Sequence, residues 1–329
     1  MSFFAILFAL LMEQVRPVGR DNPIHTGLRA WARWVSRNFD AGQSQHGWLS
    51  WGLTVGCPSV AALAVHWLLM YFVGWPFAVL WSAALLYITL GFRQFSHHFT
   101  AIRDALDAGD EARAREALAH WQQVDASELP RSEIVRHVIE YSVLAAHRHV
   151  FGVLAWFSIL AALGLGPAGA VLYRCSEFAF RHWRYTGRFV QQPVSDALQL
   201  AAAQAWRVID WVPARITALG FAVVGSFEEA IDSWRNHSQH FPNDNDGVIL
   251  AATAGAINVR LGGEALKTVI SLPAPGDGDL DSVPQPDVGT TPGREPEPAY
   301  LPQVVGLVWR SVVMWLVLLA LLTLARLLG

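Results

Sequence analysis

The sequence contains little charge, almost no lysine and only two cysteines. Charged residues make up 16% of its 329 residues, against roughly 25% in ordinary soluble domains. Lys267 is the one lysine and the net charge is −3, so the chain lacks the global basic field that nucleic-acid binding would need. Cys57 and Cys175 both lie in apolar runs, which excludes a disulfide framework and a cysteine-based zinc motif.

The common catalytic motifs are absent as well. The sequence contains no P-loop, no G-x-G-x-x-G fingerprint, no G-x-S-x-G elbow and no H-E-x-x-H pair. Two histidine pairs, His97/His98 and His147/His149, lack the i, i+4 spacing of a helical metal site. They predict histidines at a membrane–water interface, with metal ligation as the alternative. Residue spacing alone therefore establishes no catalytic chemistry.

Apolar residues, by contrast, are abundant. Hydrophobic residues make up 53% of the chain and 15 residues are tryptophan, and the mean hydropathy is +0.30. A soluble core could not use that much apolar surface without leaving some of it exposed, and indole rings favour the lipid headgroup region. We therefore predict an all-α, polytopic integral membrane protein.

Long apolar runs predict where the membrane helices lie. The N-terminal region, residues 1–95, contains predicted helices at about 1–15, 48–73 and 75–95 around a polar loop. The first helix is shorter than the ~20 residues that span a bilayer without tilt, and we interpret it as a retained, partly inserted helix. A C-terminal transmembrane helix is predicted in residues 300–329.

Residues 96–149 are predicted to form a polar helical insert. Gly109 divides its first part into two helices, and Asp110 is a suitable N-cap for the second one. Another helix is predicted from about Glu128 to His149. Because the insert is rich in arginine, the positive-inside rule assigns it to the cytoplasm.

The second half of the chain is predicted to be more irregular. Residues 150–272 begin with an apolar run that glycine and proline interrupt at 164–169, which favours a re-entrant hairpin over one straight span. A helical region follows. Residues 273–299 are rich in Pro, Gly and Asp and predict a flexible linker. The broken segment also leaves a transporter-like protein as an alternative.

A polar stripe marks the helix predicted at 128–149. Glu133, Arg136, Glu140 and His147 follow one another at steps that keep them on one helical face. One interpretation is the polar wall of a site above the membrane. The more common meaning of such a stripe is a solvated face with an ordinary intrahelical ion pair.

An apolar stretch at residues 208–219, VIDWVPARITAL, holds Asp210, Pro213 and Arg215 within six residues. Proline is favoured in the first turn of a helix, so the pattern predicts a helix that starts near Pro213. Ionisable groups near lipid are usually paired or functional. The stretch is therefore either a capped helix at the membrane surface or part of a site.

Several fragments, taken in order, resemble motifs of the CobD/CbiB family. The most distinctive is DWVPARITAL at 210–219, which is similar to the family's Asp-x-x-Pro-Ala-Arg-x-Thr motif. The others are RDNPIH at 20–25, ALDAGDEARAREAL at 105–118, VDASEL at 124–129, IVRHVIE at 134–140, GLGPAGAVLYR at 164–174 and PNDNDGVILAATAGAINVRLGG at 242–263.

The resemblance implies an inner-membrane enzyme of cobalamin synthesis. Family members attach aminopropanol phosphate to a carboxylate of a corrinoid, with ATP and Mg²⁺, and form adenosylcobinamide phosphate. Arginines would then hold phosphate and carboxylate groups, and acids would hold magnesium or orient the amine. The site residues that the resemblance implies are Asp110, Arg113, Asp125, Arg136, Glu140, Asp210 and Arg215.

Two segments depart from the family pattern. The stretch YSVLAAHRHVFGVLAW contains no acid where the family has Glu-Asn and Asp, and CSEFAFRHW carries only Glu177 where the family has Asn-Thr-x-Asp-Ser. The loss of these groups, together with the C-terminal membrane helix, resembles the AmpE branch, which implies a non-enzymatic modulator of β-lactamase induction. The sequence leaves both functions open, and it leaves a monomer and a homo-oligomer open.

Overall fold

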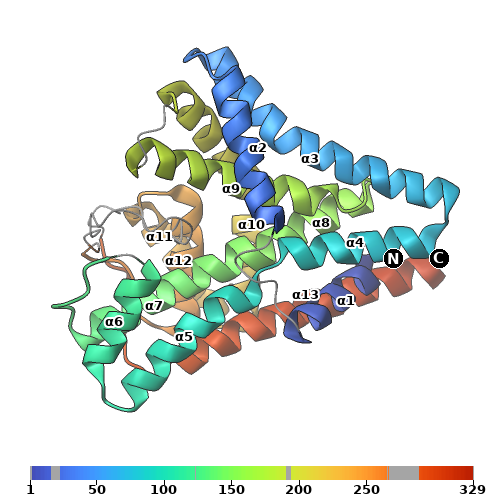
Figure 1. Ribbon diagram of the computed structural model, residues 1–329. Helices are drawn as coiled ribbons and strands as arrows, with labels where there is room; N and C mark the ends of the chain where they lie inside the picture. The colour runs from blue at the N-terminus through green and yellow to red at the C-terminus, as the bar shows by residue number, and fades with distance from the viewer. Residues whose placement is uncertain are drawn as a thin grey trace. The chain divides into compact units, whose positions relative to one another are not determined.

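The computed structural model describes residues 2–15, 23–122, 124–189, 194–264, 266 and 289–328. Within these ranges the predicted all-α fold is confirmed, because every regular element is helical (Figure 1). The elements are α1 (Ser2–Val15), α2 (Pro23–Phe39), α3 (Ser44–Phe72), α4 (Trp75–Thr89), α5 (Phe92–Asp107), α6 (Glu111–Gln122), α7 (Arg131–Ala146), η1 (His147–Phe151), α8 (Gly152–Ala162), α9 (Ala168–Phe189), α10 (Asp196–Val224), α11 (Phe227–His237), η2 (Ser238–His240), α12 (Asp244–Ile257) and α13 (Tyr300–Leu328).

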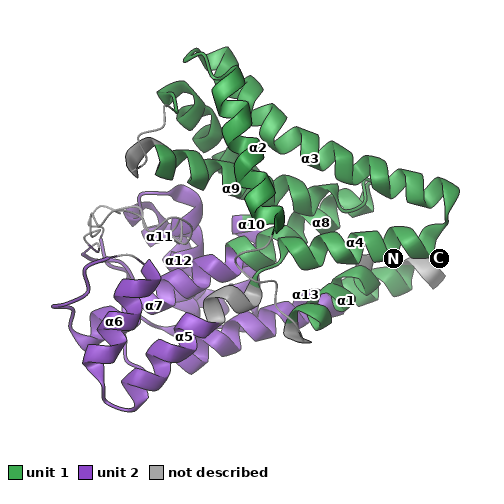
Figure 2. Ribbon diagram, in the orientation of Figure 1, with its two compact units in different colours: residues 1–91, 148–213, 318–329 green, residues 92–147, 214–317 purple. Residues whose placement is uncertain are grey.

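The helices form two compact units, coloured separately in Figure 2. Unit 1 consists of residues 1–91, 148–213 and 318–329, and unit 2 consists of residues 92–147 and 214–317. The predicted insert, 96–149, therefore falls mainly in unit 2, where residues from much later in the chain join it.

Three described helical segments are long and apolar enough to cross a membrane: Ser44–Phe72, Arg131–Ala162 and Tyr300–Ala325. The first and last agree with the predicted spans. The predicted span 75–95 is wrong in length, because α4 ends at Thr89 after 15 residues, or about 22 Å at 1.5 Å per residue, which is short of a bilayer core of about 30 Å.

The segment Arg131–Ala162 also differs from expectation. The sequence analysis divides it into an insert helix and a separate apolar run, whereas α7, η1 and α8 follow one another without a break. Two-thirds of its most apolar window is buried, 67%. It is therefore mainly packed inside the protein, which the period of its polar residues does not reveal.

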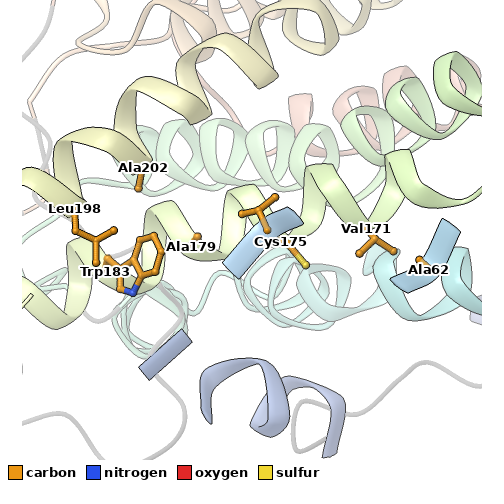
Figure 3. Packing of buried hydrophobic residues seen from close by; sticks show 8 residues of the cluster. Ala62, Val171, Cys175, Ala179, Trp183, Leu198 and Ala202 are labelled. Atoms are coloured by element: carbon orange, nitrogen blue, oxygen red, sulfur yellow. The ribbon is translucent and has the colours of Figure 1, made fainter. Parts of the chain in front are cut away.

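Helix α9 supplies much of the core of unit 1. Val171, Cys175, Ala179 and Trp183 recur at every fourth residue and so line one face of this helix. That face packs against Ala62 of α3 and against Leu198 and Ala202 of α10 (Figure 3). The opposite face of α9 carries charged residues and is described with the site below.

Helices α8 and α9 form a tightly packed hairpin. The predicted break at 164–169 is confirmed, since α8 ends at Ala162, α9 begins at Ala168, and Gly164 and Gly166 adopt positive φ angles of 80° and 55°. A Cβ atom on Gly169 would lie only 2.1 Å from the backbone oxygen of Trp156. Glycine is thus required there for the two helices to approach.

Unit 2 contains the predicted helical hairpin of α5 and α6. Gly109 turns the chain with φ of 76°, and the Asp110 side chain accepts a hydrogen bond of 3.0 Å from the Arg113 backbone N–H, as an N-cap does. The apolar stripe of α6, which contains Ala114, Leu118 and Trp121, is buried.

The predicted linker, 273–299, is only partly described, since residues 273–288 lie outside the described residues. The described end is not a linker. Thr291 and Leu261 exchange backbone and side-chain hydrogen bonds of 2.8 Å, and the Arg294 carbonyl accepts the Arg260 N–H, also at 2.8 Å. Backbone pairing with 258–261 therefore orders this segment in spite of its Pro- and Gly-rich composition.

Candidate functional site

The helix start predicted at Pro213 is wrong, because α10 runs without interruption from Asp196 to Val224. A proline inside a helix has no N–H to donate to the carbonyl four residues earlier, which here belongs to Ile209. The indole N–H of Trp156 on α8 donates to this carbonyl at 2.9 Å. A side chain of unit 1 thus satisfies the group that proline leaves open, and the helix can continue.

Asp210 lies directly beside this carbonyl and is fully buried. Its Oδ1 atom accepts a hydrogen bond of 2.8 Å from the phenol of Tyr173 on α9. Burial, followed by the charge of Asp210, raises the pKa of Tyr173 well above its ordinary value. The tyrosine therefore remains a neutral hydrogen-bond donor at physiological pH.

Glycine at position 152 makes room for the tyrosine. A Cβ atom built on Gly152 would lie 2.0 Å from the Tyr173 ring, so no other residue fits there without displacing the ring. Tyr173, Gly152 and Asp210 come from three helices of unit 1. The sequence singles out Asp210 but not Gly152.

The charged face of α9 is also buried. Glu177 is 2% exposed and Arg181 is 9% exposed. Arg174 Nη1 contacts Glu177 Oε2 at 2.5 Å, and Arg181 forms an ion pair with the other oxygen of the same carboxylate. Glu177, the one acid of the segment CSEFAFRHW that departs from the family pattern, thus lies between two arginines.

A second polar cluster lies in unit 2 around Arg136. This guanidinium is 3% exposed. It donates to Glu133 at 2.5 Å and 2.9 Å and to both oxygens of Glu140 at 3.2 Å. It also donates to the backbone oxygen of Glu264 at 2.6 Å, while Glu140 Oε1 accepts the N–H of Gly262 at 2.7 Å. The arginine and the glutamate together hold the Gly262–Glu264 backbone against α7.

The solvated-face interpretation of the α7 stripe is therefore wrong. His147, at the end of the stripe, is fully buried and lies 2.9 Å from the Thr217 hydroxyl. Ile134 and Val138, on the opposite face, are fully buried as well. Beyond the first turn, where Glu133 is half-buried, residues 134–139 and 142–146 of the helix are buried, and amphipathic spacing cannot distinguish that case from an exposed polar face. His147 and His149 are buried inside the protein, and their place at a membrane–water interface stays a prediction.

Arg215 belongs to unit 2 and is half-buried. Its Nη1 atom donates to Asn245 Oδ1 at 2.9 Å, and Asn245 is 1% exposed. Two fragments of the family resemblance, 210–219 and 242–263, meet in this contact. Asp210 and Arg215 thus each have a partner on another helix, Tyr173 and Asn245.

The remaining predicted site residues have local roles. Asp110 and Arg113 are exposed and form the N-cap described above. Asp125 is exposed and accepts hydrogen bonds from the Ser127 N–H at 3.0 Å and hydroxyl at 2.7 Å, which is an Asx turn. These contacts explain the three residues as turn and cap groups.

The described carboxylates fit cationic partners better than a resident metal ion. Glu133 and Glu140 bond to Arg136, Glu177 pairs with Arg174 and Arg181, and Asp210 accepts the Tyr173 hydroxyl. Within the described ranges, no three His, Cys, Asp or Glu side chains are grouped so that they could hold a metal ion. The arginines, in turn, suit phosphate and carboxylate groups.

Comparisons with known proteins are consistent with the fragments noted in the sequence. The family model described as "CobD/Cbib protein" matches residues 5–282. A cobalamin biosynthesis protein CobD from Stutzerimonas stutzeri is 30% identical over 324 residues, which cover 96% of each chain. Proteins of the same name from Chromobacterium violaceum and Leptospira interrogans are 33% identical over 183 residues, 55% of each chain, and 28% identical over 215 residues, 62% of this chain and 64% of the relative. No solved structure matches.

Proposed function

Because this chain belongs to the CobD/CbiB family, a family of membrane proteins, we propose that it acts in cobalamin biosynthesis and forms adenosylcobinamide phosphate. The reaction joins the amine of aminopropanol phosphate to a carboxylate of adenosylcobyric acid as an amide. The relatives are named for cobalamin biosynthesis, and none of those reported above carries an AmpE name. The AmpE-like modulator therefore has no specific support.

One observation carries this proposal: fragments that resemble the family but lie far apart in sequence meet through buried polar contacts. In unit 1, Tyr173 from the 164–174 fragment bonds to Asp210 from the 210–219 fragment. In unit 2, Glu140 from the 134–140 fragment bonds to Gly262 from the 242–263 fragment. A structural membrane protein has little need to bury such groups, since each costs desolvation energy.

The groups present suit the binding steps of such a ligase. Arginines can hold the phosphate of one substrate and carboxylates of the other through charge-assisted hydrogen bonds. Asp210, held by Tyr173, can accept a hydrogen bond from the substrate amine and orient it. ATP supplies the activation of the carboxylate. We propose that Mg²⁺ arrives with ATP as a substrate complex, since Mg²⁺ is commonly held by phosphates and water with one or two carboxylates.

The proposal also fixes location and partners. The protein would reside in the bacterial inner membrane, cross it several times, and expose the 96–149 insert to the cytoplasm, where the arginine-rich flanks belong. Its partners would be the lipid bilayer and a corrinoid, and a homo-oligomer is compatible with the proposal.

Complementation tests this function. A bacterial strain that lacks the cobinamide-forming step would be supplied with cobyric acid and with this gene. We expect growth with the wild type and strongly reduced growth with Arg215→Ala, because Asn245 then loses its charged partner. Arg294→Ala is the matched control, since its side chain is exposed and only its backbone pairs with 258–260.

Membrane levels of all variants would be measured by immunoblot. Failure of the wild type to restore growth while it accumulates in the membrane would contradict the proposed reaction. Equal growth with the two arginine variants would instead show that the function does not require the Arg215 side chain and that its segment is only a structural helix.

A further inference from the structure

Helix α2 of unit 1 carries exposed basic residues that the proposed reaction does not use. Arg29, Arg33 and Arg37 recur at every fourth residue, so they lie along one side of the helix. Arg29 is half-buried, whereas Arg33 and Arg37 are exposed. Two positive charges, one helical turn apart, are therefore accessible from outside the protein.

No neighbouring acid on α2 neutralises these two charges. The helix, Pro23–Phe39, contains no Asp or Glu. Asp40 follows it directly, but its carboxylate accepts hydrogen bonds from the N–H of Ser195 at 2.9 Å and from its hydroxyl at 2.5 Å. Within the described residues, the structure pairs neither Arg33 nor Arg37 with a carboxylate. Both guanidinium groups thus suit an anionic partner outside the chain.

An exposed tryptophan lies beside these arginines. Trp34 is 50% exposed and precedes Arg37 by three residues, so the two side chains are neighbours on the helix surface. The Trp34 ring stacks on Trp31 at a centroid distance of 5.2 Å. Ala32 and Val35, on the opposite face, are buried. The exposed side of α2 therefore joins guanidinium groups to an indole ring, as helices at a membrane surface do.

The surroundings of α2 also fit a membrane surface. The helix packs against α3 (Figure 1), which is long and apolar enough to cross a membrane. Only residues 40–43 separate the two helices, and residues 41–92 contain no Asp, Glu, Lys or Arg. Trp48 and Leu49, near the start of α3, are exposed as well. The apolar surface of a membrane-spanning helix thus begins close to the end of α2 that carries Arg37.

We propose that the α2 surface, formed by Arg33, Trp34 and Arg37, binds the headgroups of anionic phospholipids. Guanidinium groups bond to phosphate oxygens through several N–H groups, and indole rings favour the headgroup region. Basic clusters beside membrane helices are attracted to anionic lipids. An acidic soluble partner would match the arginines but would gain nothing from the adjacent membrane helix. The inference assigns a preferred lipid to the protein and is independent of the proposed reaction.

Lipid binding measured by native mass spectrometry tests the proposal. The full-length protein, purified in an uncharged detergent, would be titrated with phosphatidylglycerol and, separately, with phosphatidylcholine of the same acyl chains. The wild type should bind phosphatidylglycerol more tightly. The double variant Arg33→Gln/Arg37→Gln should weaken that binding by roughly tenfold or more, because each arginine near an anionic lipid surface contributes a factor of about five. Its binding of phosphatidylcholine should change little.

Two further variants separate a loss of charge from other effects. Arg33→Lys/Arg37→Lys keeps both charges and should retain most of the preference for phosphatidylglycerol. Arg260→Gln/Arg294→Gln removes two exposed arginines of unit 2 and should bind lipid like the wild type. The unfolding temperatures of all variants would be compared with that of the wild type, and exposed positions on α2 should leave it unchanged.

Several results would overturn the proposal. They are equal affinity of the wild type for the two lipids, unchanged phosphatidylglycerol binding by Arg33→Gln/Arg37→Gln, and an equal loss of binding in the lysine variant or in the unit 2 variant. The same spectra count protein chains. A lipid-free dimer that the Arg33→Gln/Arg37→Gln change separates would show that a second copy covers α2 instead of lipid.

Discussion

At the scale of single residues, the contact between Trp156 and the Ile209 carbonyl explains how a proline can lie inside α10. The indole N–H replaces the backbone donor that Pro213 lacks. Asp210 follows directly, so the same contact helps to fix the carboxylate that Tyr173 contacts. Proline here marks a side-chain contact rather than the first turn of a helix.

Trp156→Phe should lower the thermal unfolding temperature of the protein. The change leaves the half-buried Ile209 carbonyl without a donor, which costs about 1 kcal/mol. Pro213→Ala restores a backbone N–H at the right position, so the double variant should recover most of the loss. Trp75→Phe, which alters an exposed tryptophan of α4, is the control. A double variant no more stable than Trp156→Phe alone would disprove this account.

His182 gives the protein a pH-dependent stability. Burial, then Arg33 and Arg29, lower its pKa to about 4 from an ordinary value of 6.5. Between these values the unfolded chain takes up a proton that the folded protein does not, so stability falls as the pH falls through this window.

His182→Phe should reduce this dependence, because the ring that stacks on Phe178 is kept but can no longer be protonated. The measurement is the unfolding temperature at pH 7 and pH 5. The drop between the two should be smaller for His182→Phe than for the wild type, and unchanged for the exposed His97→Phe. Equal drops in all three proteins would contradict the assignment.

Sequence reasoning located part of this chemistry. It selected Asp210, Arg215, Arg136 and Glu140, all of which the structure places in buried or half-buried polar contacts. It could not select Tyr173 or Trp156, because their roles depend on helices that pack from elsewhere in the chain. For Tyr173, the available hint was its place near the end of the glycine-rich fragment 164–174, which resembles the family.

At the scale of helices, α9 has two buried faces. One is apolar and packs on α3 and α10, and the other is charged. Charge normally indicates exposure, so sequence periodicity places the second face in solvent. The same error affects the stripe on α7. Helix positions and breaks were predictable from apolar runs and glycines, whereas full burial of a polar face depends on tertiary packing, which a single sequence does not encode locally.

Gly152→Ala tests the close packing of α8 and α9. The added methyl group would overlap the Tyr173 ring, and such overpacking costs about 1–3 kcal/mol. It should also displace the phenol from Asp210 and impair growth in the complementation assay. Gly52→Ala on α3 is the matched control: a Cβ there meets nothing within 4 Å, so helix propensity should make it neutral or slightly stabilising. Equal stability of both variants would show that the hairpin is loose.

At the scale of the whole molecule, composition alone correctly predicted a membrane protein. Low charge and long apolar runs led to an all-α membrane protein, and family membership agrees with it. The division into units was less predictable. Unit 2 combines residues 92–147 with residues 214–317, and no composition boundary in the sequence indicates that these segments fold together.

The most direct test of this account is product formation by the purified protein in lipid nanodiscs. Adenosylcobyric acid, aminopropanol phosphate and ATP with Mg²⁺ would be supplied, and adenosylcobinamide phosphate would be measured by mass spectrometry. We predict product with the wild type and with Arg294→Ala, and a large loss with Asp210→Asn, which keeps the size of the side chain but removes its charge. Absence of product from folded, membrane-inserted wild-type protein, or full activity of Asp210→Asn, would contradict the account.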